Sequence, residues 1–220
     1  YYSIRSEHHG MDGRIIVEGG KFINNGISNV RVRGNSVVRD AYVRCDGHHR
    51  DFENMRGIRL TDYEPQAEDE PAIVENCRVE MLDVTESDGG IVLSSQLAAG
   101  VVRDTTVKVD ADGIPGIRVK APDSSLSDFD VTPRIRLERV TLNGNAGGGE
   151  AIHVSERNNG VFESIDIYQP GEDRDGMVFI RSNGNRLRNG RIRVSGEPII
   201  LDESALDRQG VEQMVLGIFG

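Results

Sequence analysis

Apolar and polar residues alternate in short runs, and these runs recur along most of the chain. Each run of the first kind has six positions. In order they hold an apolar residue, a charged residue, a residue that is usually Asn, Asp or Ser, a variable residue, a polar residue and a second apolar residue. A period of two residues is typical of a strand with one buried face, so we expect each run to form one short alternating strand. The six copies are residues 38–43, 74–79, 102–107, 137–142, 162–167 and 187–192.

A second kind of run, four residues long and mostly aliphatic, alternates with the first. Successive copies start between 22 and 35 residues apart. A repeat of this length, with Gly and Asn in the turns, indicates a parallel β-helix, in which each strand pairs with its equivalent in the next coil. An antiparallel sandwich would instead need hairpin turns every ~8–12 residues and would show no long period. The seven copies are residues 29–32, 57–60, 90–93, 116–119, 151–154, 176–179 and 198–201.

The repeat pattern of residues 14–201 resembles that of the right-handed parallel β-helix, or pectin-lyase-like, superfamily. The resemblance lies in the repeats and includes no catalytic motif. It implies an all-β, right-handed solenoid of about seven coils, and right-handed crossovers between parallel strands are strongly favoured. We expect a lead-in or cap over 1–13, the β-helix over 14–201, and a C-terminal cap or partner-contact tail over 202–220.

Alignment of the repeats predicts two aliphatic ladders in the interior, one from each kind of run. Equivalent residues of neighbouring coils should stack ~4.8 Å apart. The first ladder comprises Val43, Val79, Val107, Leu142, Ile167 and Ile192. The second comprises Ile58, Ile91, Ile117, Ile152, Met177 and Ile199.

Composition agrees with a narrow aliphatic core and indicates an acidic surface. The 220 residues include 5% aromatic residues and no Trp, and the formal net charge is −10. Lys21, Lys108 and Lys120 are the only lysines. An acidic, lysine-poor surface fits a protein from a salt-loving organism, where salt screens the self-repulsion, although an Arg-rich codon usage would explain the lysine count equally. The acidity argues against nucleic acid as a partner, and no apolar run approaches the ~18 residues of a membrane span.

The two cysteines fall in neighbouring coils but in different columns. Cys45 aligns with Met81, whereas Cys77 aligns with Ala41. Four residues along a strand correspond to on the order of 13 Å, which is too far for a disulfide. We therefore expect two buried free thiols. The five histidines (His8, His9, His48, His49 and His153) show no zinc spacing, and we expect them at the surface or in turns.

Two coils are longer than the others because of acidic, Pro-bounded insertions at the same turn. The insertions are residues 61–71 and 121–133. Long loops on a solenoid often mark the functional face. They are also tolerated at low cost as surface insertions, and both explanations remain open here.

The third position of each second-type run should face outward and forms the clearest candidate site. This column contains Arg31, Arg59, Val92, Arg118 and His153. Arginine binds carboxylates bidentately, so the four cationic residues are candidates for binding a uronate- or sulfate-bearing glycan. The competing explanation is that outer columns of a β-helix must be polar, and Arg is the default cation of this chain.

Carboxylates at equivalent positions just upstream form a second, weaker candidate site. They are Glu150, Asp175 and Glu197. Stacked carboxylates could bind Ca²⁺ or serve as the acid and nucleophile of a retaining glycosidase. The catalytic candidates are Glu150, Asp175 and His153. Polysaccharide lyases of the superfamily use Ca²⁺-binding Asp residues with a catalytic Arg or Lys, and that set is not matched here.

The sequence therefore favours a non-enzymatic surface or structural module without a cofactor. We expect it on a cell envelope or in a virion, in the manner of a tail spike, recognising a glycan or a protein neighbour. The alternative is a polysaccharide lyase or glycoside hydrolase acting on acidic polysaccharide. A third hypothesis is an assembly subunit that forms a homo-oligomer through the apolar segment 214–219.

Overall fold

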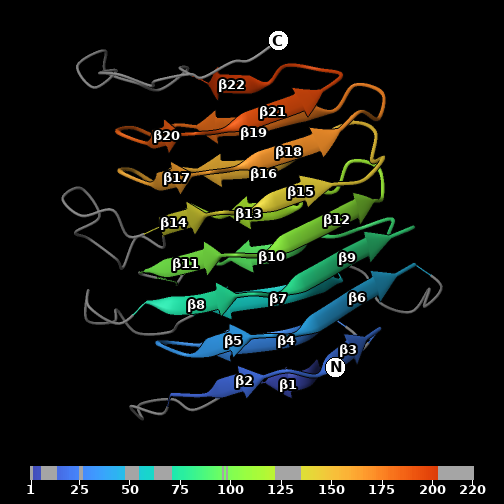
Figure 1. Ribbon diagram of the computed structural model, residues 1–220, viewed down its shortest axis with the longest axis vertical. Coiled ribbons are helices and arrows are strands. Elements are labelled where there is room, and N and C mark those ends of the chain that lie inside the picture. Colours follow the sequence, from blue (N-terminus) through green and yellow to red (C-terminus); the bar gives the residue numbers. More distant parts are fainter. Residues whose placement is uncertain are drawn as a thin grey trace.

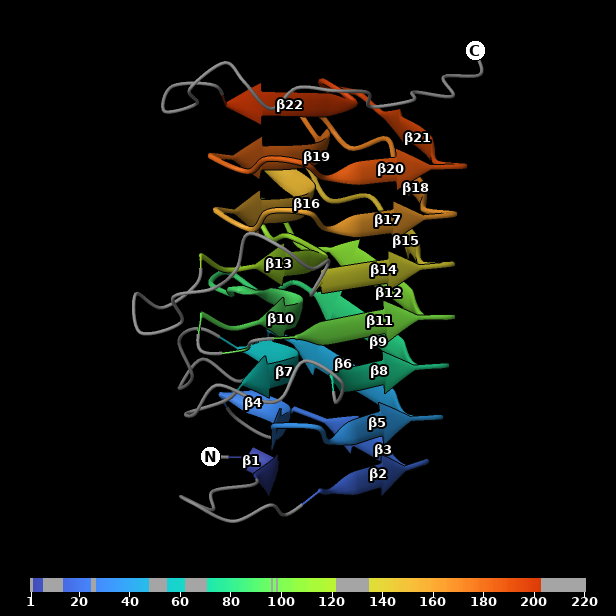
Figure 2. The same ribbon diagram turned by 90° about the vertical axis from the view of Figure 1, so that its left-hand side faces the viewer.

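The computed structural model describes residues 2–5, 14–24, 27–47, 55–61, 71–95, 97, 99–121 and 135–202. Every regular element within these ranges is a strand, and the strands stack into a column of coils (Figures 1 and 2). Three sheets run the length of the column, and all strand pairs in them are parallel. The chain is a right-handed parallel β-helix, as the repeat pattern predicts.

Each coil contributes one strand to each sheet, in the order A, B, C. Sheet A contains β1 (Tyr2–Arg5), β4 (Ser28–Arg33), β7 (Arg56–Thr61), β10 (Gly89–Leu93), β13 (Ile117–Val119), β16 (Glu150–Ser155), β19 (Asp175–Ile180) and β22 (Ile199–Asp202). Sheet B contains β2 (Ile16–Glu18), β5 (Val37–Arg39), β8 (Ala72–Glu75), β11 (Gly100–Arg103), β14 (Ile135–Glu138), β17 (Val161–Glu163) and β20 (Arg186–Arg188). Sheet C contains β3 (Lys21–Ile23), β6 (Tyr42–Asp46), β9 (Arg78–Leu82), β12 (Thr106–Asp110), β15 (Thr141–Asn143), β18 (Asp166–Gln169) and β21 (Arg191–Val194).

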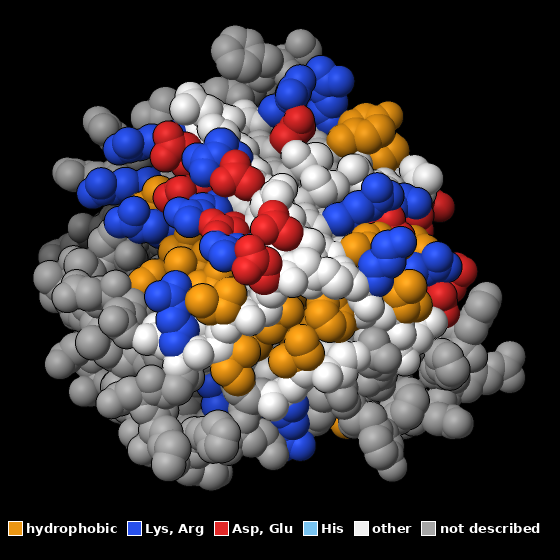
Figure 3. Space-filling view, turned by 60° about the horizontal axis from the view of Figure 1, so that its bottom comes forward, with side chains coloured by type: hydrophobic (Ala, Val, Ile, Leu, Met, Phe, Trp, Pro, Cys, Tyr) orange, Lys and Arg blue, Asp and Glu red, His pale blue; other side chains and the backbone are white. Residues whose placement is uncertain are grey.

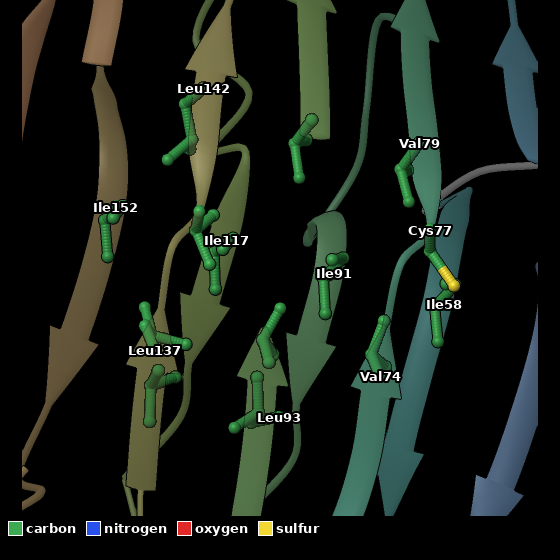
Figure 4. Packing of buried hydrophobic residues seen from close by; sticks show 14 of the residues in the cluster. Ile58, Val74, Cys77, Val79, Ile91, Leu93, Ile117, Leu137, Leu142 and Ile152 are labelled. Carbon is green, nitrogen blue, oxygen red and sulfur yellow. The ribbon is translucent and has the colours of Figure 1, made fainter. Parts of the chain in front are cut away.

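The interior consists of the aliphatic ladders that the sequence predicts. Ile58, Ile91, Ile117 and Ile152 are successive register partners in sheet A and point into the column (Figure 4). Val79 and Leu142 belong to the equivalent ladder of sheet C. Both ladders keep their predicted register through all six members. Stacked β-branched side chains fill such a narrow core well, which explains the scarcity of aromatic residues.

The expectation of one strand for each first-type run is wrong. Each run is two strands, one in sheet B and one in sheet C, joined at a corner. The residue at the third position of the run adopts a left-handed backbone, with φ between 49° and 57°. This conformation turns the chain from one sheet into the next, and Asn and Asp tolerate it better than most residues. The corner residues are Asp40, Asn76, Asp104, Arg139, Ser164 and Asn189.

The ends of the column add detail to the predicted domain boundaries. Residues 2–5 form β1, which pairs with β4, so part of the expected N-terminal lead-in belongs to sheet A. At the other end β22 closes with Asp202. Asp202, the first residue of the tail predicted over 202–220, belongs to β22. The rest of that tail and the histidine pairs at 8–9 and 48–49 lie outside the described residues. The described ranges contain no helix of the length and hydrophobicity needed to cross a membrane.

Both cysteines are buried free thiols, as predicted. Burial raises the pKa of Cys45 to about 12 and that of Cys77 to about 11. Because the thiolate is the reactive form, neither thiol should react in the folded protein. We expect iodoacetamide at pH 8 to leave the native protein unmodified and to alkylate both cysteines in denaturant, as measured by intact mass. Rapid alkylation of the native protein would contradict this packing.

Candidate functional site

Sheet A places the predicted cationic column in one continuous register. Arg31 pairs with Arg59, and Arg118 pairs with His153, with Val92 between the two pairs. The column continues to Val178 in β19 and Ile200 in β22. Its members lie on the outer side of the sheet, because the residues that flank them in each strand belong to the buried ladders.

This outer face is more enclosed than the sequence predicts. Arg31 is 7% exposed, His153 9% and Val92 0%. Arg118 and Lys120 are more accessible, since about a third of each side chain remains exposed. A ligand would therefore reach Arg118 and Lys120 more readily than Arg31 in β4 or His153 in β16.

Three cations from different parts of sheet A surround one carboxylate, Asp88. The Nε of Arg56 donates to Asp88 Oδ2 at 2.6 Å, and Nζ of Lys120 donates to the same oxygen at 2.9 Å. Nη1 of Arg118 lies 3.6 Å from Oδ1. Asp88 precedes β10, while Arg118 and Lys120 are two residues apart and share the outer side of the sheet. Among the described residues, the cluster thus carries three positive charges and one negative charge, within a chain whose formal net charge is −10.

The Asp88 cluster predicts an acid-sensitive contribution to stability. Burial pushes the pKa of Asp88 upward, but hydrogen bonds from Lys120 and Arg56 outweigh burial and leave it below the ordinary 3.8. A carboxyl group whose folded-state pKa is lowered stabilises the fold above its unfolded-state pKa, and the contribution is lost as pH falls through the folded-state value. We expect the free energy of unfolding, measured by denaturant titration, to decline below pH 4.

The variant Asp88→Asn isolates this contribution. It should lower the free energy of unfolding at pH 7 by about 1–3 kcal/mol, because charged hydrogen bonds are lost in a partly buried site. Its own decline between pH 4 and pH 2 should be shallower than that of the wild type. Equal acid slopes would show that Asp88 is not held as these contacts indicate.

A second constellation, along β16, joins Glu150, His153 and Ser155. His153 Nδ1 lies 2.7 Å from Glu150 Oε1, and His153 Nε2 lies 2.7 Å from Ser155 Oγ. Ala151 and Ile152 are both buried in the core, which puts Glu150 and His153 on the same outer side despite their spacing of three residues. When Nδ1–H donates to the carboxylate, Nε2 is placed to accept the hydrogen bond of the Ser155 hydroxyl.

The structure thus brings together two of the three catalytic candidates, Glu150 and His153. The hydrogen bond from His153 lowers the pKa of Glu150, and the charges of His153, Arg118 and Arg174 add to this effect against the cost of burial. A retaining glycosidase needs an acid whose pKa is raised. Glu150 is therefore better suited to orient His153 than to protonate a glycosidic oxygen.

The remaining carboxylates do not converge on one point. Asp175 is the register partner of Glu150 in the next coil, and its Oδ1 accepts the main-chain N–H of Glu197 at 2.8 Å. The Glu197 residue itself is exposed. Among the described residues, no three His, Cys, Asp or Glu side chains gather as metal ligands would.

Sheets B and C carry charge in a different arrangement, shown by the alternating acidic and basic side chains of Figure 3. There some cations pair with a carboxylate of the adjacent coil, and others pair with a carboxylate two residues along the same strand, as Lys108 does with Asp110. Arg39 contacts Glu18 at 3.0 Å, Arg103 contacts Glu75 at 2.5 Å and Arg191 contacts Asp166 at 2.9 Å. Opposite charges at directly paired positions stabilise adjacent strands modestly. These pairs neutralise themselves, whereas within the described part of the chain the cations around Asp88 outnumber the carboxylates that they contact.

Two buried arginines support the sheet A face, and the sequence analysis missed both. Arg174 is 0% exposed and donates to Gln169 Oε1 at 2.8 Å, Gly148 O at 2.9 Å and Ile114 O at 2.9 Å. Burial lowers the pKa of Arg174 to about 10, which leaves the side chain charged at neutral pH.

Arg157 is also buried and donates hydrogen bonds to main-chain carbonyls, at the corner between sheets A and B. Its Nε donates to Lys120 O at 2.8 Å and its Nη2 to Ser94 O at 3.1 Å. It therefore fixes the main chain of the residue that supplies a cation to Asp88. The acceptors are main-chain carbonyls just beyond β13 and β10, one and two strands away from β16 in sheet A, and carbonyls leave no signature in a sequence.

Lys120, Arg56, Asp88 and Ser155 are also functional candidates that the sequence analysis did not select. Lys120 and Ser155 could have been found, because each stands two residues beyond a selected residue on the same face. Arg56 and Asp88 could not, since Arg56 is the first residue of β7 and Asp88 immediately precedes β10, and the turns before them differ in length.

Comparison of the chain with protein-family models finds no match, and comparisons with the curated proteins and with the solved structures find none either. The fold and the candidate site therefore rest on the repeats, the register and the side-chain geometry described above.

Proposed function

We propose that the chain is a recognition module that binds an acidic glycan across the outer face of sheet A. The observation that carries the proposal is the excess of cations around Asp88, where Arg56, Arg118 and Lys120 share one carboxylate. A uronate carboxylate or a sulfate group would supply the missing negative charge, and Arg118 offers a guanidinium that can bind it bidentately.

The extended shape of the sheet supports a chain-like ligand. Arg59 and Arg118 lie in one column of the sheet, two coils apart with Val92 between them, and neighbouring coils are about 4.8 Å apart. The side chains form a row along the sheet, which fits binding along a polymer better than attack on a single bond. A location on a cell envelope or a virion belongs to this proposal, as does adaptation of the acidic surface to high salt.

The proposal is tested by a glycan array that contains uronate-bearing, sulfated and neutral glycans, probed in molar salt. An assay for reducing ends and unsaturated uronates runs in parallel on the same ligands. We expect binding to the acidic glycans and not to the neutral ones, without release of either product. Equal binding of neutral glycans would contradict the proposal. Product release would instead favour the alternative of a lyase or glycoside hydrolase.

A further inference from the structure

The hydrogen-bonded chain from Glu150 through His153 to Ser155 has the arrangement of a nucleophile, a base and an orienting carboxylate. Both links are 2.7 Å long, which is within the reach that proton transfer requires. The roles follow from the proton positions: the carboxylate fixes the Nδ1–H tautomer, and Nε2 is free to accept the Ser155 proton. His153 is 9% exposed, so little water competes for these bonds.

Cations beside the serine supply the other requirement of acyl transfer, which is stabilisation of a developing oxyanion. Arg118 is the register partner of His153, and Val119 that of Val154. Lys120 directly follows the end of β13, and Ser155 is the last residue of the neighbouring strand β16. Lys120 Nζ is already held at Asp88, 2.9 Å from Oδ2. A positive charge that is already held in place near the reacting atoms lowers the energy of an anionic intermediate.

We propose that Ser155 is the nucleophile of an acyl-transfer site that hydrolyses carboxylic esters. Its Oγ forms a bond to the ester carbonyl carbon while its proton moves to His153 Nε2, and the carbonyl electron pair becomes an oxyanion facing Lys120. Collapse of this intermediate breaks the bond to the alcohol oxygen, which takes the proton from Nε2. Water then attacks the acyl group in the same way, releases the carboxylic acid and restores the Ser155 hydroxyl.

The substrate class is an ester of a small acyl group. If the proposed glycan binding holds, the ester is an acyl substituent of the bound glycan, since Arg118 belongs to both sites. The acyl-transfer step itself does not depend on the glycan. It adds a catalytic activity to a module that the sequence predicts to be non-enzymatic, and it leaves the glycosidic bond intact.

The test is covalent labelling of the purified full chain with an alkyl fluorophosphonate, followed by intact mass measurement and peptide mapping. Attack by Ser155 Oγ on phosphorus expels fluoride and leaves a stable adduct. We expect one adduct per chain, located at Ser155. We also expect hydrolysis of p-nitrophenyl acetate to fall by at least about 100-fold in Ser155→Ala and in His153→Gln, as loss of nucleophilic or base catalysis requires.

Ser182→Ala is the matched control. Its hydroxyl lies one coil further along at the same corner and donates to Ile180 O at 3.1 Å, with no histidine bonded to it. This variant should label as the wild type does.

Thermal unfolding of each variant separates loss of reactivity from loss of fold. Glu150→Gln should still form the adduct, at a reduced rate. Absence of an adduct in the folded wild type, or labelling of His153→Gln at the wild-type rate, would overturn the proposal. Because the probe contains no sugar, this outcome is independent of the glycan array.

Discussion

Replacement of Arg174 by methionine is expected to lower the free energy of unfolding by about 3–5 kcal/mol, as for other buried charged groups removed from their partners. Three acceptors would lose their donor: Gln169 Oε1, Gly148 O and Ile114 O. They belong to separate segments of the column, so one side chain ties together parts of three coils. Methionine fills similar volume but donates nothing to them. Denaturant unfolding followed by circular dichroism measures the loss.

Two further variants show whether the loss depends on the planar guanidinium, on the positive charge alone or on the buried position. Arg174→Lys keeps a positive charge but lacks the planar fork, so it should recover only part of the loss. Arg191→Met removes an arginine that is largely exposed and paired with Asp166, and such pairs contribute about 0–1 kcal/mol. A cost for Arg174→Met as small as that for Arg191→Met would contradict the structural role assigned to the buried arginine.

Truncation of Phe162 to alanine is expected to cost about 3–5 kcal/mol, the range for a buried phenylalanine. Phe162 is 0% exposed and meets the Phe179 ring edge to face, with centroids 5.4 Å apart and an interplanar angle of 89°. The two rings come from β17 in sheet B and β19 in sheet A, and consecutive coils supply them. The cavity would therefore open between coils, where the rigid ladders on either side cannot collapse to fill it.

Tyr168→Ala is the control for Phe162→Ala. The Tyr168 side chain projects from β18 and the residue is 55% exposed, so its truncation should change the free energy of unfolding by less than about 0.5 kcal/mol. Similar costs for the two truncations would mean that the column is not packed around the Phe162–Phe179 contact. Thermal and denaturant unfolding of both variants make the comparison.

The ladders could be predicted from the sequence because each depends on a residue type recurring at a fixed place in the repeat. Ile58, Ile91 and Ile117 occupy one column, and a one-residue slip would expose all of them. The corners were missed although their signal was present: the frequent Asn, Asp or Ser at the third position of each first-type run is the left-handed residue. Treating Asp40 or Asn76 as a strand residue merged two sheets into one.

The candidate site could be predicted only in part. The outward column from Arg31 to His153 follows from strand alternation, so its register was predictable. The convergence on Asp88 was not, because turns of different length carry Arg56 and Asp88 to the same point. The burial of Arg157 and Arg174 could not be predicted for another reason. Arginine is almost never fully buried unless it is paired, and the partners of these two arginines are mainly main-chain carbonyls, which any residue type supplies.

The most direct test of the account is equilibrium binding of an acidic oligosaccharide, chosen from the array, to two charge-matched double variants. Arg118→Gln with Lys120→Gln removes two cations from the Asp88 cluster. Arg139→Gln with Arg191→Gln removes two from the self-neutralised pairs, in which Arg139 is bonded to Asp104. Titration calorimetry at one fixed salt concentration should show a loss of affinity of at least about 30-fold for the first variant, since charged hydrogen bonds contribute about 1.5–3 kcal/mol each. The second variant should bind within about threefold of the wild type. Equal losses in the two variants would show that net charge alone governs binding and would contradict a site on sheet A.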